Sequence, residues 1–130
     1  MTSELRVDNL KGSTTGGSIS VLGEGTSATT NLQQGLCKAW LNANDDSSLD
    51  DSFNISSNLD NTTGDYTYSF TNNTNNTNFC ITSICIDNNA EICHNNSRAT
   101  SSYGIRIKEG DDGSTARDRP QSGTMHGDLA

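Results

Sequence analysis

The residues of this chain best suited to metal or thiol chemistry are four cysteines and two histidines. Cys80, Cys85, Cys93 and His94 lie close in sequence, whereas Cys37 is distant. A structural zinc site usually takes closely spaced cysteine pairs, but here four and then seven residues separate consecutive cysteines. Cys80 and Cys85 would also point to opposite faces of a straight strand. We therefore expect no metal site and no cofactor.

Two states of the thiols stay open at this stage. An even number of cysteines allows disulfides in a protein released into an oxidising environment. Assembly in a reducing cytosol instead favours free thiols that are buried as small hydrophobic groups. Cys93 and His94 are adjacent, so on a strand they would point to opposite faces and make a poor nucleophile–base pair. No short motif typical of hydrolases, metalloproteases or P-loop proteins is present, and we expect neither a catalytic residue nor an enzyme.

Acidic residues gather in the segment Asn44–Asp51, which contains four aspartates. Hard cations such as Ca²⁺ take oxygen ligands, so a calcium site is conceivable here. The segment lacks the central glycine and the terminal glutamate of the helix–loop–helix calcium loop. The spacing favours a solvated acidic loop.

Composition limits the class of protein. The chain has 130 residues, of which only 30% are hydrophobic, and its net charge is −8. The abundance of Asn, Ser, Thr, Gly and Asp disfavours helix. The acidic balance argues against a nucleic-acid partner, since phosphate contacts need clustered Lys and Arg. No apolar run is long enough to span a bilayer, and no signal peptide is visible, so we expect synthesis in a cytosol and no membrane partner.

Alternating apolar residues predict strands, and an antiparallel β-sheet protein follows from them. Both faces of the predicted strand Leu36–Ala43 carry apolar groups, so this strand should lie in mid-sheet or under an oligomer contact. Asp60–Asp65 is typical of a hairpin turn. Thr29–Gln34 favours one helical turn followed by Gly35. Further strands are expected at Phe53–Ile55, Tyr66–Phe70, Phe79–Asp87, Glu91–Cys93 and Tyr103–Ile107, with an edge strand at Thr124–Leu129.

The predicted fold is all-β: one antiparallel β-sandwich-like, jelly-roll-like domain over residues 28–130. A short N-terminal β-hairpin, residues 1–27, should anchor the domain through Leu5, Val7, Ile19 and Val21. The thin core suggests a homo-oligomer, since a neighbour can cover an apolar face. The core is expected to contain Trp40, Phe53, Ile55, Tyr66, Tyr68, Phe70, Phe79 and Ile81.

Two signatures carry a family resemblance. The first is Gly-Leu-Cys-Lys-Ala-Trp-Leu-Asn at residues 35–42, and the second runs from Asp51-Ser-Phe-Asn-Ile-Ser-Ser to Gly64-Asp-Tyr-Thr-Tyr-Ser-Phe-Thr-Asn. This stretch resembles small virion proteins of marine bacteriophages, especially those that infect cyanobacteria. Between Trp40 and Phe53 the chain departs from the Gly/Thr-rich segment of that family. The resemblance implies a tail-fibre-like or head-surface virion component with a β-rich domain and no catalytic residue.

The resemblance, together with a separable N-terminal segment ahead of the strand-rich core, implies a tail-fibre or knob-like protein on the virion surface, assembled in the host cytoplasm with other virion proteins. A trimer would be natural for a fibre-like module, although no heptad or collagen-like repeat supports it. The alternative is a capsid decoration protein that stabilises the head shell. Host attachment, to a surface glycan or protein, would use exposed loops at Thr71–Asn78 and Asn88–Arg98. The candidate binding residues there are Asn72, Asn73, Asn75, Asn76, Asn88, Asn89, Asn95 and Asn96.

Overall fold

The computed structural model describes residues 4–14, 19–22, 27–86, 91–110 and 112–128. Contacts within the chain divide it into two units, Met1–Leu36 and Cys37–Ala130. This division falls after Leu36, later than the boundary at residue 27 that the sequence suggested. Each unit is described by itself below.

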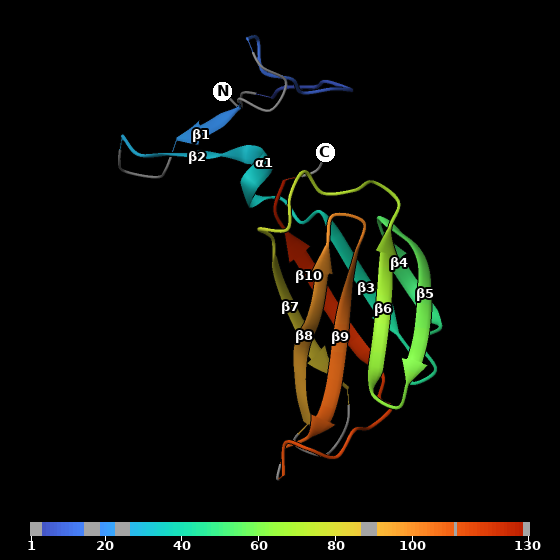
Figure 1. The fold of residues 1–130 in the computed structure, drawn as a ribbon. Helices are drawn as coiled ribbons and strands as arrows, with labels where there is room; N and C mark the ends of the chain where they lie inside the picture. The colour runs from blue at the N-terminus through green and yellow to red at the C-terminus, as the bar shows by residue number, and fades with distance from the viewer. Residues whose placement is uncertain (1–3, 15–18, 23–26, 87–90, 111, 129–130) are drawn as a thin grey trace. The chain divides into compact units, whose positions relative to one another are not determined.

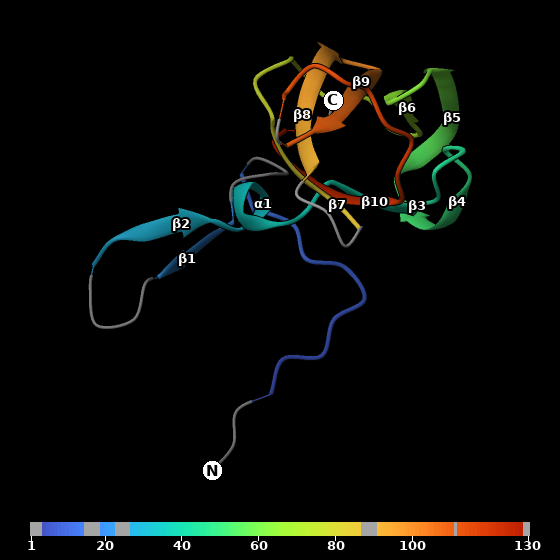
Figure 2. The ribbon, with the colours of Figure 1, turned by 90° about the horizontal axis from the view of Figure 1, so that it is seen from below.

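The larger unit consists of two four-stranded antiparallel sheets that lie against each other as two layers (Figures 1 and 2). This confirms the prediction of an all-β, sandwich-like fold. The β3 sheet has the order β4-β3-β10-β7, and its strands are β3 (Ala39–Ala43), β4 (Leu49–Phe53), β7 (Cys80–Cys85) and β10 (Gln121–His126). The β6 sheet has the order β5-β6-β9-β8, and its strands are β5 (Ile55–Thr62), β6 (Asp65–Phe70), β8 (Glu91–Ala99) and β9 (Ser102–Glu109).

The core lies between the two sheets and is formed by side chains that point inward at every second position of each strand. In β3 the buried residues are Ala39, Leu41 and Ala43, while Trp40 and Asn42 between them face outward. Because side chains alternate across a strand, each strand needs apolar residues only at every second position. A chain with few hydrophobic residues can therefore still fill one layer. The remaining buried apolar residues are Tyr66, Tyr68, Phe70, Phe79, Tyr103, Ile105, Ile107 and Met125.

Four aromatic rings form a connected cluster within this core. The ring centroids of Phe70 and Tyr103 are 5.6 Å apart, and those of Tyr68 and Tyr103 are 5.7 Å apart. Phe70 and Phe79 meet edge to face at 5.9 Å. Tilted and edge-to-face contacts of this kind stabilise by more than their buried area alone. Tyr66, Tyr68, Phe70 and Phe79 are thus buried as the sequence suggested, and Ile55 and Ile81 pack against them at the margin.

Two residues expected in the core lie outside it. Phe53 is 51% exposed, and Trp40 is half-buried on the outer face of the β3 sheet. The alternation of Phe53 with Ile55 suggested one continuous strand, but the chain changes sheets between them. Asn54 has φ of +60°, and its side chain bonds the carbonyls of Lys38 and Asn72. Asparagine tolerates this left-handed backbone. Apolar residues therefore still alternate along the sequence across Asn54, although Phe53 and Ile55 belong to different sheets.

The C-terminal strand β10 is central and not an edge strand. It pairs with β3 on one side and with β7 on the other. Its inward residues are Gln121, Gly123 and Met125, so only one large apolar side chain marks its buried face. A weak hydrophobic pattern therefore concealed a strand that lies in the middle of its sheet.

In the N-terminal unit, β1 (Ser20–Leu22) pairs antiparallel with β2 (Thr29–Asn31), and a helical turn α1 (Leu32–Gly35) follows. The expected strand at Leu5 and Val7 is wrong, because residues 4–10 contain no strand. The partner of β1 is instead the next strand along the chain. Asn31 caps α1 by accepting a hydrogen bond from the Gln33 amide at 2.9 Å, so the turn begins three residues later than expected.

Candidate binding face

The outer face of the β3 sheet carries an open groove of about 420 Å³. Outward-facing side chains of three adjacent strands line it: Trp40 and Asn42 of β3, Ser122 and Thr124 of β10, and Thr82 and Ile84 of β7. We call this surface the Trp40 face. Ile84 is 65% exposed. The groove is therefore accessible, and it lies on regular strands, which position side chains more firmly than loops do.

Strand register sets the side chains of the Trp40 face in rows. Thr124 lies between Trp40 on one side and Thr82 on the other. Trp40 in turn lies opposite Phe53 of β4. Directly paired residues point to the same face of a sheet. An aromatic pair thus lies beside two threonine hydroxyl groups.

The neighbouring row contains two polar side chains, those of Asn42 and Ser122, and hydrogen bonds orient them. Ser122 lies between Asn42 and Ile84. The Ser122 hydroxyl donates to the Asn42 side-chain oxygen at 2.9 Å. The Asn42 amide nitrogen lies 3.5 Å from a carboxylate oxygen of Asp50, and the other oxygen of Asp50 accepts from the Asn44 amide at 2.9 Å. The Asn42 amide is therefore held in one orientation before any ligand arrives.

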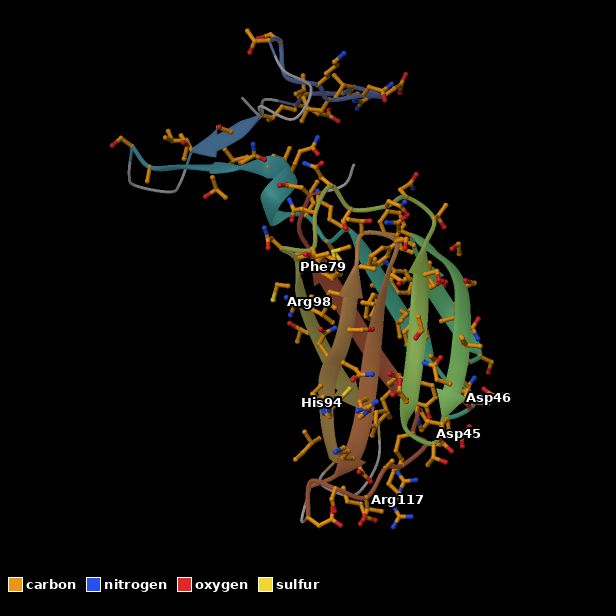
Figure 3. All side chains as sticks on the ribbon, in the orientation of Figure 1. Asp45, Asp46, Phe79, His94, Arg98 and Arg117 are labelled. Atoms are coloured by element: carbon orange, nitrogen blue, oxygen red, sulfur yellow. The ribbon has the colours of Figure 1, made fainter. Side chains whose placement is uncertain are left out.

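At one end of the Trp40 face, register places the exposed thiol of Cys80 opposite the exposed His126. Among the described residues, no group of three or more His, Cys, Asp or Glu side chains lies close enough to hold a metal ion. The acidic segment instead forms a tight turn in which Asp46 accepts hydrogen bonds from the amide and hydroxyl of Ser48. These bonds lower the pKa of the Asp46 carboxyl. Figure 3 shows Asp45 and Asp46 at the end of the sandwich opposite Phe79.

The asparagines that the sequence suggested for binding follow a different pattern. Asn72, Asn73, Asn75 and Asn76 are exposed in the loop after β6, but this loop is packed onto the end of the sandwich. The buried Thr74 donates its amide to the Thr100 carbonyl at 2.8 Å. The Asn72 amide donates to the Asn54 side chain at 2.7 Å. At this end the Arg98 guanidinium lies 5.7 Å from the Phe79 ring centre (Figure 3).

Asn95 and Asn96 lie in strand β8 and not in a loop, which corrects the expectation for Asn88–Arg98. The Asn95 amide donates to the carbonyls of Ser97 and Gly104 at a register shift of the strand, and so supports a bulge. The Asn96 amide donates to Asp65. Both side chains therefore serve the fold. Asn88 and Asn89 lie outside the described residues.

Sequence reasoning missed the Trp40 face, although one signal pointed to it. Apolar groups on both faces of Leu36–Ala43 indicated a strand in mid-sheet or under an oligomer contact, but the sequence pattern placed Trp40 in the core. The residues that surround Trp40 come from β10 and β7, which are distant in sequence. Only strand register brings them together.

Comparison with protein-family models, with curated proteins and with solved structures gives no match to this chain. The helix α1 has four residues, and nothing helical in the described ranges is long and apolar enough to cross a membrane.

Proposed function

We propose that this protein is a non-enzymatic surface module of a bacteriophage virion, of the tail-fibre or knob type, which attaches to a glycan on the host surface. The Trp40 face is the attachment site. The observation that carries the proposal is a half-buried tryptophan that lines an open groove and is flanked by an oriented amide group and a hydroxyl group.

The chemistry of the Trp40 face suits a sugar. A pyranose ring has an apolar face of C–H groups, which stacks on an indole, and a rim of hydroxyls, which need hydrogen-bond partners. Trp40 supplies the ring, and Asn42, Ser122 and Thr124 supply the partners. Aromatic side chains contribute contact area at low cost in conformational entropy. Because strands and hydrogen bonds already hold these groups, little freedom is lost on binding.

The negative charge of the protein favours a neutral glycan over an acidic one as the ligand. Asp51 lies opposite Asn42 in the β3 sheet, and Asp50 bonds the Asn42 amide. The whole chain carries a net charge of −8. Like charges across an interface oppose association. Acidic polysaccharides should therefore bind less well than neutral ones.

The virion context rests on the resemblance of residues 35–72 to small virion proteins of marine phages. A particle would display many copies, and several weak sites linked together bind far more tightly than one. Assembly as a homo-oligomer, with a trimer the natural form for a fibre, is part of the same proposal. The N-terminal unit would dock on other virion proteins, and it offers exposed apolar side chains for this purpose at Leu5, Val7 and Val21.

The experiment compares three forms of the purified protein for binding to intact host cells and to their isolated neutral surface polysaccharide. Trp40→Ala removes the stacking surface. Leu59→Ala is the matched control, because Leu59 is an exposed apolar residue, 58% accessible, on a strand of the other sheet. We expect Trp40→Ala to lose binding at least tenfold and Leu59→Ala to bind as the wild type does. Equal binding by all three forms would remove the Trp40 face from the proposal.

The second candidate is a decoration protein fixed to the capsid shell. One observation favours it: the N-terminal unit has an apolar hollow of about 280 Å³ between Val21, Leu32 and Leu36, beside residues of β2. Both proposed functions require a surface that docks on other virion proteins. A decoration protein requires only this surface, whereas an attachment protein also requires a ligand-binding site. Antibody labelling of intact particles separates the two. Label at the tail periphery supports attachment, and label over the icosahedral shell supports decoration.

A further inference from the structure

Two cysteines face each other at one edge of the sandwich. Cys85 is the last residue of β7, and Cys93 lies in β8. These strands are the edge strands of the β3 sheet and the β6 sheet, respectively. Both side chains are partly buried and pack against the core. Each thiol therefore points inward from its own sheet.

The contacts of Cys93 bring the two sulfurs together. Its Sγ lies 3.2 Å from the hydroxyl of Ser83, which precedes Cys85 by two residues and so shares its face of β7. The Cys85 thiol lies near enough to Cys93 to shift its pKa. The Ser83 contact therefore holds Cys93 against the inner face of β7, next to Cys85. A disulfide requires this kind of approach between facing side chains.

We infer that Cys85 and Cys93 form a disulfide that joins the two sheets once the protein leaves a reducing environment. A small-molecule disulfide such as oxidised glutathione serves as the oxidant. The Cys93 thiolate attacks one sulfur of this reagent, so that a mixed disulfide forms and one thiol leaves. The Cys85 thiolate then attacks the Cys93 sulfur and displaces the second thiol. The cysteines lose two electrons, and the reagent gains them as two thiols, which also carry the two protons.

The surroundings favour Cys93 as the first nucleophile. The hydrogen bond from the Cys85 thiol, aided by the Ser83 hydroxyl, lowers the pKa of Cys93 to about 7. The same hydrogen bond, together with burial, raises the pKa of Cys85. The thiolate is the reactive form in disulfide exchange. Glu91, which forms an ion pair with Arg119 at 3.3 Å, opposes ionisation of Cys85, and Arg119 favours it.

The other two cysteines are placed differently. Cys80 belongs to β7, but it lies an odd number of residues before Cys85 and so faces outward, where it is exposed. The Cys37 thiol donates to the carbonyl of Ala39 at 3.0 Å. All four cysteines are free thiols in this structure. Cys80 and Cys37 therefore provide matched controls for a bond specific to Cys85 and Cys93.

The disulfide would add a covalent cross-link at an edge where side-chain packing and the Cys93–Ser83 hydrogen bond already hold β7 against β8. A covalent link restricts the unfolded chain, and so stabilises the native state. The protein would thus assemble with free thiols in a cytosol and gain resistance to unfolding after release. This inference does not depend on the ligand proposed for the Trp40 face.

The test treats the folded full-length protein with a glutathione redox buffer and measures its intact mass without reduction. We expect a loss of about 2 Da, the mass of two hydrogens. Cleavage on the amino side of aspartate separates residues 65–86, which carry Cys80 and Cys85, from residues 87–110, which carry Cys93. The two peptides should remain joined until a reductant is added. Oxidation should also raise the unfolding midpoint by about 5 °C or more.

Variants assign the bond to its two partners. Cys80→Ser and Cys37→Ser should keep both the mass loss and the rise in midpoint. Cys85→Ser and Cys93→Ser should lose both. If a variant does not fold, fragmentation of the joined wild-type peptides in the mass spectrometer separates Cys80 from Cys85 and assigns the bond. A wild-type map with no joined peptides, or a link that Cys80→Ser abolishes, would overturn the inference.

Discussion

Two buried tyrosines on neighbouring inward positions of β6 differ in the partners of their hydroxyl groups. The Tyr66 hydroxyl lies 2.8 Å from the carbonyl oxygen of Asp45 and 3.0 Å from a carboxylate oxygen of Asp118. Asp118 also accepts from the Gly64 amide at 2.6 Å. The Tyr68 hydroxyl is buried and has no hydrogen-bond partner among the residues that the structure describes. A buried polar group gains stability only when it is paired.

Removing the two hydroxyl groups should therefore have different effects on the free energy of unfolding. We expect Tyr66→Phe to lower the free energy of unfolding by about 1 to 2 kcal/mol, because it breaks a paired buried group. Tyr68→Phe should change it by less than about 0.5 kcal/mol or raise it. Urea denaturation of both variants measures the difference. Equal losses in the two variants would show that the hydroxyl of Tyr68 is satisfied in solution.

Residue-scale roles were the hardest to predict from the sequence. The types of Asn72, Asn95 and Asn96 suggested ligand contacts, yet each of these side chains bonds another part of the same fold. The Asn72 side-chain amide donates to the Asn54 side chain, that of Asn95 to the Gly104 carbonyl, and that of Asn96 to the Asp65 carboxylate. An asparagine serves turns, bulges and ligands with the same amide group. Its role depends on which strand lies beside it, and this information is not local.

At the scale of elements, the hairpin between β5 and β6 depends on one glycine. Gly64 has φ of +66°, and a Cβ there would lie 2.5 Å from the Ile107 carbonyl oxygen and 2.9 Å from the Arg117 amide nitrogen. Gly113 has a similar φ of +63°, but a Cβ there would meet nothing within 4 Å. A side chain at Gly113 would therefore add backbone strain alone, whereas a side chain at Gly64 would add both backbone strain and steric overlap.

Alanine at the two glycines tests this difference. Gly113→Ala should cost about 1 kcal/mol, the cost of a left-handed backbone in a residue with a side chain. Gly64→Ala should cost about 2 to 4 kcal/mol, because backbone atoms must also move. Chemical denaturation gives both values. Equal costs would contradict the close approach of β9 and the Arg117 segment to the turn.

Alternation identified most strands of the larger unit, and the turn Asp60–Asp65 was recognisable from its residue types. The change of sheet at Asn54 and the central place of β10 were not predictable in this way. Alternation reports that a strand has a buried face and an exposed face. It does not report which sheet supplies the neighbours, since pairing is set by contacts between distant segments.

At the scale of the whole molecule, the two units are joined at Leu36 and Cys37. The first backbone bond of the larger unit runs from the Lys38 amide to the Met125 carbonyl, within that unit. In the N-terminal unit, the Leu32 amide bonds the Ile19 carbonyl. The described apolar core belongs entirely to residues after Leu36.

Residues 37–130 should therefore fold without the N-terminal unit. We expect the truncated protein to unfold in one cooperative transition, with a midpoint within about 2 °C of that of the full chain. Differential scanning calorimetry of both forms makes the comparison. A broad or absent transition in the truncated form would show that the larger unit needs the N-terminal residues.

The central claim is that the Trp40 face binds a neutral glycan, and the fluorescence of Trp40 tests it most directly. The chain contains one tryptophan, so every change in indole emission reports on this face. Titration with neutral host polysaccharide should shift the emission to shorter wavelength and saturate, because a stacked sugar shields the half-buried indole from water. Emission that stays constant through saturating polysaccharide, while host cells still bind the protein, would contradict the account.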